Sequence, residues 1–215
     1  MRIAVAGGHG QIALRLTRLL RDRGDEVVSL IRNPDHADDV RTAGGDPVVC
    51  DLERAEVADV AAAVASSEAV VFAAGAGPGS GSARKETMDL GGAVKLIEAV
   101  RLDGNRHYVM VSSVGANSLA GGKDPFAAYL RAKGLADDAL MKSGLDYTIV
   151  RPTMLTDEPG DGLVFIDPHV GRGSIPRDDV AAVLAEVLHT PATIGLVFEV
   201  IDGKQPIPEA LASFR

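Results

Sequence analysis

The sequence is poor in the residue types that mark disulfide-rich or metal-binding proteins. Its 215 residues include one cysteine, no tryptophan and only 4% aromatic residues. A single cysteine cannot form an internal disulfide, and Cys50 follows two valines, so we expect a buried packing residue and not a metal ligand or reactive thiol. The five histidines show no metal-ligand spacing, and no metal is expected. The composition fits a reducing compartment, which predicts a cytoplasmic protein.

An excess of basic charge and long apolar runs are also missing. Lysine and arginine number 22 against 30 acidic residues, which gives a formal net charge of −8 with the two signs interspersed. This balance disfavours binding to nucleic acid or to an anionic membrane surface. The longest apolar run, about 69–76, is far shorter than the roughly 18 residues of a membrane-spanning helix. The first residues hold too short an apolar stretch for a signal peptide, and none is expected.

Glycine is abundant, and short apolar runs alternate with amphipathic stretches. The apolar run 2–6 predicts a strand, and apolar residues at 12, 16, 19 and 20 then follow helical spacing. The same alternation continues with strands expected at 26–32, 46–50, 69–73, 107–112, 146–151 and 196–201, and helices at about 35–43, 56–66, 85–102, 126–143, 178–189 and just beyond 206–208. Residues 157–162 are expected to form a loop. The sequence therefore predicts an α/β protein with a Rossmann-like doubly wound parallel sheet, one domain over residues 1–215 with a small C-terminal substrate region.

A glycine-rich turn follows the first predicted strand, with the sequence Gly7-Gly8-His9-Gly10-Gln11-Ile12-Ala13. Glycines allow tight backbone angles and let a pyrophosphate approach the backbone N–H groups, while the helix N-terminus carries a partial positive charge. The small side chain of Ala13 would let the helix pack closely on the strand. A purely structural turn uses the same residues, but its place in the first βα unit favours a dinucleotide site.

The end of the second predicted strand indicates which dinucleotide is bound. An acid there accepts from the ribose 2′-hydroxyl, whereas a basic residue favours a 2′-phosphate. Here the residue is Arg32, so NADP is favoured over NAD; the alternative is a solvated arginine. Asp51 could lie beside the adenine or cap the next helix. Further expected cofactor contacts lie at the ends of the second, third and fourth strands: Asn33, Leu52, Ala73, Ala74 and Gly75.

Tyr129 and Lys133 are four residues apart, which on a helix places them on one face. An ammonium in this position can lower the pKa of a phenol and bind a ribose, so Tyr129 could act as a general acid in carbonyl reduction. Ser112 and Ser113 end the fifth predicted strand, where a hydroxyl could polarise the same carbonyl. The alternative is an ordinary surface pair. These residues are the predicted catalytic group.

The glycine-rich segment 75–82 follows the fourth predicted strand. Loops at the carboxyl ends of strands line the ligand crevice in this architecture, so we expect a mobile loop that covers a ligand. An inert surface loop is the alternative. Two pairs of adjacent acids, Asp137-Asp138 and Asp178-Asp179, point apart on a helix and are expected to be caps or solvated residues.

Taken together, these motifs resemble the short-chain dehydrogenase/reductase superfamily over nearly the whole chain. The resemblance is to its atypical, single-domain NAD(P)H-binding branch, related to nitrogen-metabolite regulators and to biliverdin-IXβ and flavin reductases. The segments that carry it are 7–11, 111–113, 129–133, 143–152 and 175–181.

The resemblance implies roles for particular residues. It places Tyr129 and Lys133 at the catalytic positions and Arg32 at the 2′-phosphate. It also assigns Gly7, Gly10 and Ala13 to the pyrophosphate loop, and Arg151 and Pro152 to the cofactor, with Pro152 beginning the loop beside the nicotinamide. Two departures are His9, which replaces the more usual threonine, and the short segment after Arg151, which disfavours a nucleotide-sugar substrate.

The predicted function is an NADP(H)-dependent reductase of a small carbonyl compound, acting as a monomer or homodimer. One alternative is a non-catalytic sensor that binds the dinucleotide and reports its level to a partner protein. Another is an epimerase or isomerase that uses bound cofactor transiently, because it needs the same residues.

Overall fold

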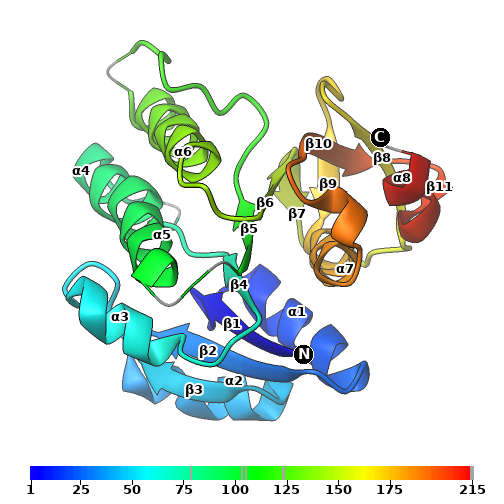
Figure 1. The fold of residues 1–215 in the computed structure, drawn as a ribbon. Coiled ribbons are helices and arrows are strands. Elements are labelled where there is room, and N and C mark those ends of the chain that lie inside the picture. The colour runs from blue at the N-terminus through cyan, green and yellow to red at the C-terminus, as the bar shows by residue number, and fades with distance from the viewer. Residues whose placement is uncertain (78, 103, 105, 123, 214–215) are drawn as a thin grey trace.

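The computed structural model describes residues 1–77, 79–102, 104, 106–122 and 124–213, and a single large sheet organises them. The sheet has nine strands in the order β11-β8-β10-β6-β5-β4-β1-β2-β3 (Figure 1). From β3 to β10 all neighbours are parallel, and β8 and β11 add an antiparallel edge. The strands are β1 (Arg2–Ala6), β2 (Glu26–Ile31), β3 (Asp46–Val49), β4 (Ala69–Phe72), β5 (His107–Val111), β6 (Tyr147–Pro152), β8 (Leu163–Asp167), β10 (Val197–Asp202) and β11 (Gln205–Pro206). The predicted Rossmann-like doubly wound sheet is confirmed.

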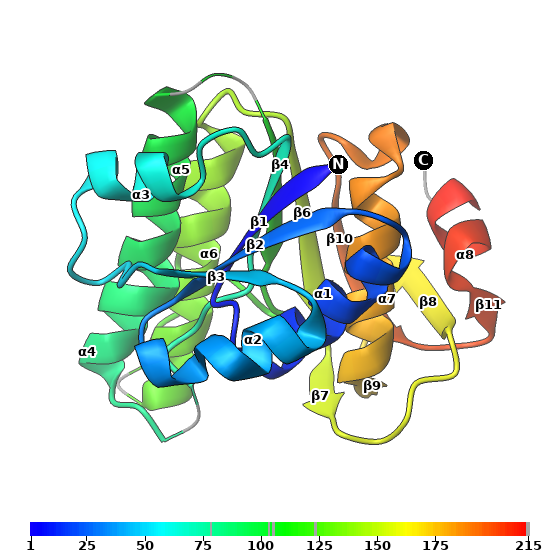
Figure 2. The same ribbon diagram turned by 90° about the horizontal axis from the view of Figure 1, so that it is seen from below.

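Helices cover both faces of this sheet. Figure 2 shows α3, α5 and α6 on one face and α1, α2 and α7 on the other. The helices are α1 (Gln11–Asp22), α2 (Ala37–Ala43), α3 (Val57–Ala63), α4 (Ser82–Arg84), α5 (Ala93–Leu102), α6 (Pro125–Met141), α7 (Arg177–Leu188) and α8 (Ile207–Ser213), with 3₁₀ turns η1 (Pro34–His36) and η3 (Pro191–Thr193). None of the helices in the described part of the chain is long and apolar enough to cross a bilayer.

The two-sided cover explains the apolar strands. All four residues of β4 are fully buried, since the strand lies in the middle of the sheet and both of its faces carry helices. Helix α1 buries Ala13, Leu16, Thr17 and Leu20. Leu19, which the spacing also placed on the apolar face, is 36% exposed. Thr17 lies on the buried face of α1 where Leu19 was expected, and its hydroxyl donates to the carbonyl oxygen of Ala13 at 2.8 Å.

The structure differs from the predicted elements mainly in two regions. The expected helix over 85–102 is α5 preceded by a π-helical segment, η2 (Lys85–Gly92). Beyond residue 152, the strands β8 and β11 and the short pair β7 (Met154–Thr156) and β9 (Ser174–Pro176) were not predicted. Three residues are too few to show an alternation of apolar and polar side chains, so strands this short cannot be predicted from sequence. They form because they pair with a segment that is distant in the chain.

Candidate active site

The glycine turn that joins β1 to α1 packs tightly on the segments beside it. Gly7 has a φ of +80°, and a Cβ there would lie 2.6 Å from the Cα of Ala74. A Cβ on Gly8 would lie 2.5 Å from the Cβ of Ser29. Both glycines are therefore required by close packing of the turn on β4 and β2.

Gly10 has a different reason to lack a side chain. It is the N-cap of α1, its φ of −64° is accessible to any residue, and no side chain caps the N–H groups of the first turn. The cavity beside it is lined by Gly7, His9 and Gly10. Gln11 is exposed at the first position of α1, and Ala13 is buried against the sheet. Uncapped N–H groups at the end of a twelve-residue helix, facing a cavity, fit a phosphate group.

Two adjoining cavities lie at the carboxyl ends of the parallel strands. The larger has a volume of about 650 Å³ and the smaller about 260 Å³. Ala73, Ala74 and Gly75, directly after β4, line both cavities. Most of the predicted cofactor contacts line one groove, large enough for a small-molecule ligand. Gly8, Gln11, Ala13, Asn33 and Arg151 are not part of its lining.

The larger cavity holds the predicted catalytic residues. Its lining includes Ser112, Ser113, Tyr129 and Lys133, together with Ile12 and Pro152. The Nζ of Lys133 lies 5.9 Å from the centre of the Tyr129 ring and donates to the carbonyl oxygen of Val111 at 3.0 Å. Phe126, 65% exposed, also borders this cavity. The helical spacing of the tyrosine and lysine does place both at one cavity.

Asp89 is a site residue that the sequence reading missed. Its Oδ1 lies 3.6 Å from the Nζ of Lys133, and its Oδ2 accepts from the backbone N–H of Ala76 at 3.2 Å. Only 1% of the Asp89 side chain is exposed. It belongs to η2, and π-helical segments occur frequently at functional sites. The available signal was an acid between the apolar residues Met88 and Leu90.

A buried polar network lies behind Ser112. Ser112 Oγ donates to Oδ2 of Asp137 at 2.8 Å, and Arg151 donates to the same oxygen through Nε at 3.0 Å. Asp137 is fully buried, and this burial raises its pKa against the opposing effects of Arg151 and Ser112. The expectation of a cap or solvated residue is wrong for Asp137, because tertiary packing of α6 on β5 and β6 encloses it. The predicted contact between Arg151 and the cofactor stays a prediction, since the guanidinium bonds to Asp137 here.

In the other acid pair, the same expectation is wrong for Asp179 but not for Asp178, whose side chain is 46% exposed. Asp179 is 2% exposed and accepts from the N–H of Gly162 at 2.8 Å. Asp178 accepts from Arg15 Nε at 2.6 Å and from the N–H of Gly160 at 3.2 Å. These acids therefore fix the 157–162 loop against α7 and α1.

The smaller cavity gathers the residues expected at the adenosine. Its lining includes His9, Arg32, Asp51 and Leu52. His9 stacks on His36 with ring centres 3.6 Å apart, and its Nε2 lies 2.7 Å from Oδ2 of Asp39. Cys50 is buried as expected, and this burial raises the pKa of its thiol. Asn33 accepts from the N–H of Asp35 and lies outside this cavity, in a neighbouring hollow that Arg32 and Asp51 also line.

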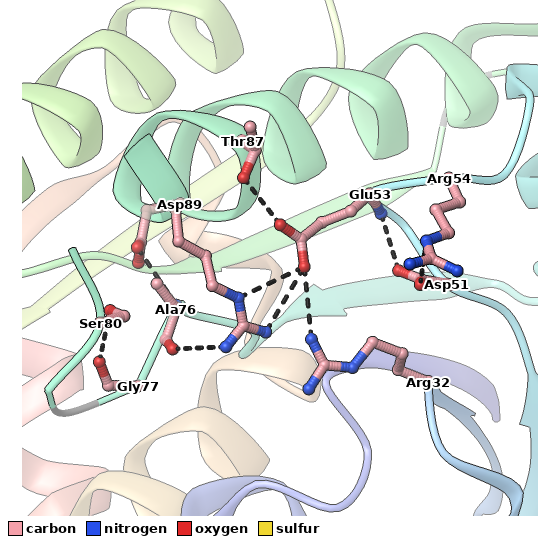
Figure 3. A network of polar contacts seen from close by, with 10 residues as sticks. Arg32, Asp51, Glu53, Arg54, Ala76, Gly77, Ser80, Thr87 and Asp89 are labelled. Carbon is pink, nitrogen blue, oxygen red and sulfur yellow. Dashed lines mark hydrogen bonds and ion pairs between the residues drawn. The ribbon is translucent and has the colours of Figure 1, made fainter. Parts of the chain in front are cut away.

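Arg32 is not free at this edge of the site. Its Nη1 lies 3.4 Å from Oε2 of Glu53, a residue just after β3 (Figure 3). Arg84 contacts the same oxygen, and Thr87 Oγ1 donates to Oε1 of Glu53 at 2.7 Å. This hydrogen bond from Thr87 is the main cause of a lowered pKa for Glu53, helped by the two arginines and opposed by partial burial.

The glycine-rich segment 75–82 borders the larger cavity, as predicted. Gly77, Gly79, Ser80 and Gly81 contribute to its lining, and Pro78 lies outside the described residues. Ser80 Oγ donates to the carbonyl oxygen of Gly77 at 2.8 Å. The predicted mobility of this loop stays a prediction.

Comparison with known proteins identifies the family. The model of a family described as NAD(P)H-binding matches residues 7–191. YhfK of Bacillus subtilis, named as an uncharacterized sugar epimerase, is 35% identical over 212 residues, covering 98% of this chain and 99% of that protein. A solved structure from Bacillus halodurans, titled as an NAD-dependent epimerase/dehydratase, is 41% identical, with a TM-score of 0.92 and complete coverage of both chains.

More distant structures share the fold. The anaerobilin reductase ChuY of Escherichia coli O157:H7 has a TM-score of 0.78 at 24% identity, covering 94% of this chain and 97% of its own. The part of the predicted resemblance that concerns an NAD(P)H-binding family is confirmed, and the distant structures add a shared fold. The chain belongs to the NAD(P)H-binding family.

Proposed function

We propose that this protein is an NADP(H)-dependent reductase of a small carbonyl compound. One observation carries the proposal. Tyr129, Lys133, Ser112 and Ser113 line a cavity that adjoins the cavity at the uncapped N-terminus of α1. A dinucleotide whose diphosphate lies at this helix end would extend along the groove toward these side chains.

NADPH would supply a hydride when bound, and the chain itself would supply the proton and the orientation. Tyr129 donates its phenolic proton to the carbonyl oxygen of the substrate. The ammonium of Lys133, beside the ring, stabilises the phenolate that remains and offers N–H groups to a ribose. Lys133 is itself held by Asp89 and by the carbonyl oxygen of Val111.

The two serines are not equivalent in this proposal. Ser112 has one hydroxyl hydrogen, and it donates that hydrogen to Asp137. It can therefore accept hydrogen bonds at the cavity but cannot donate one to a carbonyl in this arrangement. Ser113 is part-buried, and its hydroxyl donates to a neutral acceptor, the carbonyl oxygen of Val114, at 3.1 Å, a weaker bond that a substrate oxygen can replace. We assign the polarisation of the substrate oxygen to Ser113.

The test has two stages. Thermal-shift and fluorescence titrations with NADPH and NADH measure cofactor binding, and NADPH oxidation is then followed against a panel of small aldehydes and ketones. Binding followed by turnover with members of the panel is expected. Binding without turnover would instead support a dinucleotide sensor.

An epimerase is the second candidate, and the names of the Bacillus relatives favour it. It would use the same tyrosine and lysine but restore its cofactor in each cycle. Conversion of a sugar substrate without net consumption of NADPH would support it over the reductase.

A further inference from the structure

A second arginine lies beside the residue expected at the 2′-phosphate. Arg84 ends α4, and Arg32 follows β2, so the two come from different parts of the sheet edge. Arg32 Nη1 and both Nε and Nη2 of Arg84 lie 3.4 Å from one oxygen, Oε2 of Glu53. Figure 3 shows the Arg32 guanidinium and the Glu53 carboxylate turned toward each other. Three N–H groups from two arginines therefore surround a single anionic oxygen.

The arginines hold this oxygen only loosely. Charge-assisted N–H to O contacts are usually about 2.7–2.9 Å, so 3.4 Å leaves room for an oxyanion to come closer. The short contact of Glu53 is to Thr87, at 2.7 Å. Water also reaches the cluster, because 55% of the Arg32 side chain and 38% of the Arg84 side chain are exposed.

We propose that Arg84 and Arg32 together bind the 2′-phosphate of NADP, and that the Glu53 carboxylate occupies the phosphate position in its absence. The proposal rests on the proposed function, since it needs a dinucleotide in the groove. Arg84 lines the smaller cavity together with Arg32 and Asp51. The planar guanidinium fork suits a phosphate group, which it can contact through two N–H groups at once.

The charges of Arg32, Arg84 and Glu53 indicate how Glu53 affects the choice between NADP and NAD. Two arginines and one carboxylate carry a net charge of +1, whereas a phosphate monoester carries about −1.5 to −2 at neutral pH. When Glu53 rotates away, the two arginines match the phosphate. With NAD, Glu53 can stay in place and accept a hydrogen bond from the 2′-hydroxyl. Glu53 therefore lowers the preference of the site for NADP over NAD.

Arg84 also has a structural contact, which the test must separate from phosphate binding. Its Nη1 donates to the carbonyl oxygen of Ala76 at 3.2 Å, in the loop that borders the larger cavity. Loss of this contact could loosen the groove for any nucleotide. A ligand pair that differs only in the 2′-phosphate distinguishes the two effects.

The experiment is calorimetric titration of 2′,5′-ADP and 5′-AMP into the full chain. Arg84→Ala is expected to weaken 2′,5′-ADP about tenfold and to leave 5′-AMP unchanged, as expected for loss of a charge-assisted contact. Glu53→Gln is expected to strengthen 2′,5′-ADP and to weaken 5′-AMP only slightly, because the amide oxygen can still accept from the 2′-hydroxyl. The matched control is Arg41→Ala, which removes the same charge from a residue paired with Asp38 on α2.

Equal losses for both ligands in Arg84→Ala, or a loss no larger than in Arg41→Ala, would overturn the role of Arg84. Weaker binding of 2′,5′-ADP to Glu53→Gln would overturn the role of Glu53. Inorganic phosphate alone is expected to bind much more weakly than 2′,5′-ADP, and equal affinity would indicate a free-anion site instead. If the unmodified protein binds neither nucleotide nor NADPH, the proposed function fails together with this proposal. If it binds NADPH but Arg84→Ala shows no selective loss of 2′,5′-ADP, only this proposal fails.

Discussion

Asp89 and Lys133 form a buried ion pair at the candidate active site, with Oδ1 and Nζ 3.6 Å apart. Only 1% and 5% of their side chains are exposed. Asp89 comes from η2 and Lys133 from α6, two segments that pack together beside the larger cavity. Because Asp89 also accepts from the N–H of Ala76, one carboxylate connects the lysine to the loop after β4.

The first prediction concerns this pair. Asp89→Asn should lower the free energy of unfolding by about 3 kcal/mol, because it leaves a buried ammonium without its carboxylate. In a Lys133→Met background, which lacks the ammonium, Asp89→Asn should lower the free energy of unfolding by less than it does in the unmodified protein. Urea unfolding of both single variants and the double variant measures the coupling. Strictly additive losses would show that the two charges do not depend on each other.

Tyr129→Phe removes only a hydroxyl from a part-buried side chain at the cavity. The fold and cofactor affinity should survive, and kcat for a substrate found in the carbonyl panel should fall by about 10²–10⁴, the usual contribution of general acid–base catalysis. Tyr147→Phe, in β6, is the matched control and should retain kcat. Unchanged turnover in Tyr129→Phe would remove the catalytic assignment.

Gly10→Val should fold and lose NADPH binding. The φ of −64° accepts a side chain, but a Cβ would lie 3.0 Å from the backbone carbonyl oxygen of Gly7, so the turn must shift by a few tenths of an ångström. The added methyl groups would enter the cavity expected to take the diphosphate. Gly121→Val, where a Cβ meets nothing within 4 Å, is the control. Fluorescence titration of NADPH compares them, and full affinity in a folded Gly10→Val protein contradicts the dinucleotide site.

Removal of two neighbouring acids on α6 should lower the free energy of unfolding by very different amounts. Asp137→Ala should cost about 3 kcal/mol in unfolding free energy, because Arg151 and Ser112 lose a common buried acceptor. Asp138→Ala, at a part-buried position one residue further, should change it by less than about 0.5 kcal/mol. Chemical denaturation measures both, and similar losses would argue against the network.

The pair between Arg15 and Asp178 should give a pH-dependent contribution to stability. The hydrogen bond from Arg15 holds the pKa of Asp178 below its usual range. A carboxyl with a lowered folded pKa stabilises the fold above its unfolded pKa, about 3.9, and loses this effect as the pH falls through the lower folded value. Asp178→Asn should therefore cost roughly 0.5 kcal/mol at neutral pH, and the difference should shrink below about pH 4. In an Arg15→Ala background most of the difference should be absent at every pH.

Local patterns in the sequence were sufficient to predict the sheet and the general place of the site. Apolar runs of four to six residues, separated by helical periods, identified all parallel strands from β1 to β6 and β10. The glycine turn, Arg32 and the spacing of Tyr129 and Lys133 pointed to the carboxyl edge of that sheet, and these residues do line the two cavities there. Such signals are local, so a short window of sequence contains them completely.

The contacts between polar residues, in contrast, depend on how the chain folds in three dimensions. Asp89, Asp137 and Glu53 are ordinary acids in the sequence, and each acquires its partners from segments that lie far along the chain. The π-helical turn that carries Asp89 and the short strands β7 and β9 likewise depend on packing against other elements. Burial and charge pairing are properties of the folded arrangement, and no spacing within a single helix or strand encodes them.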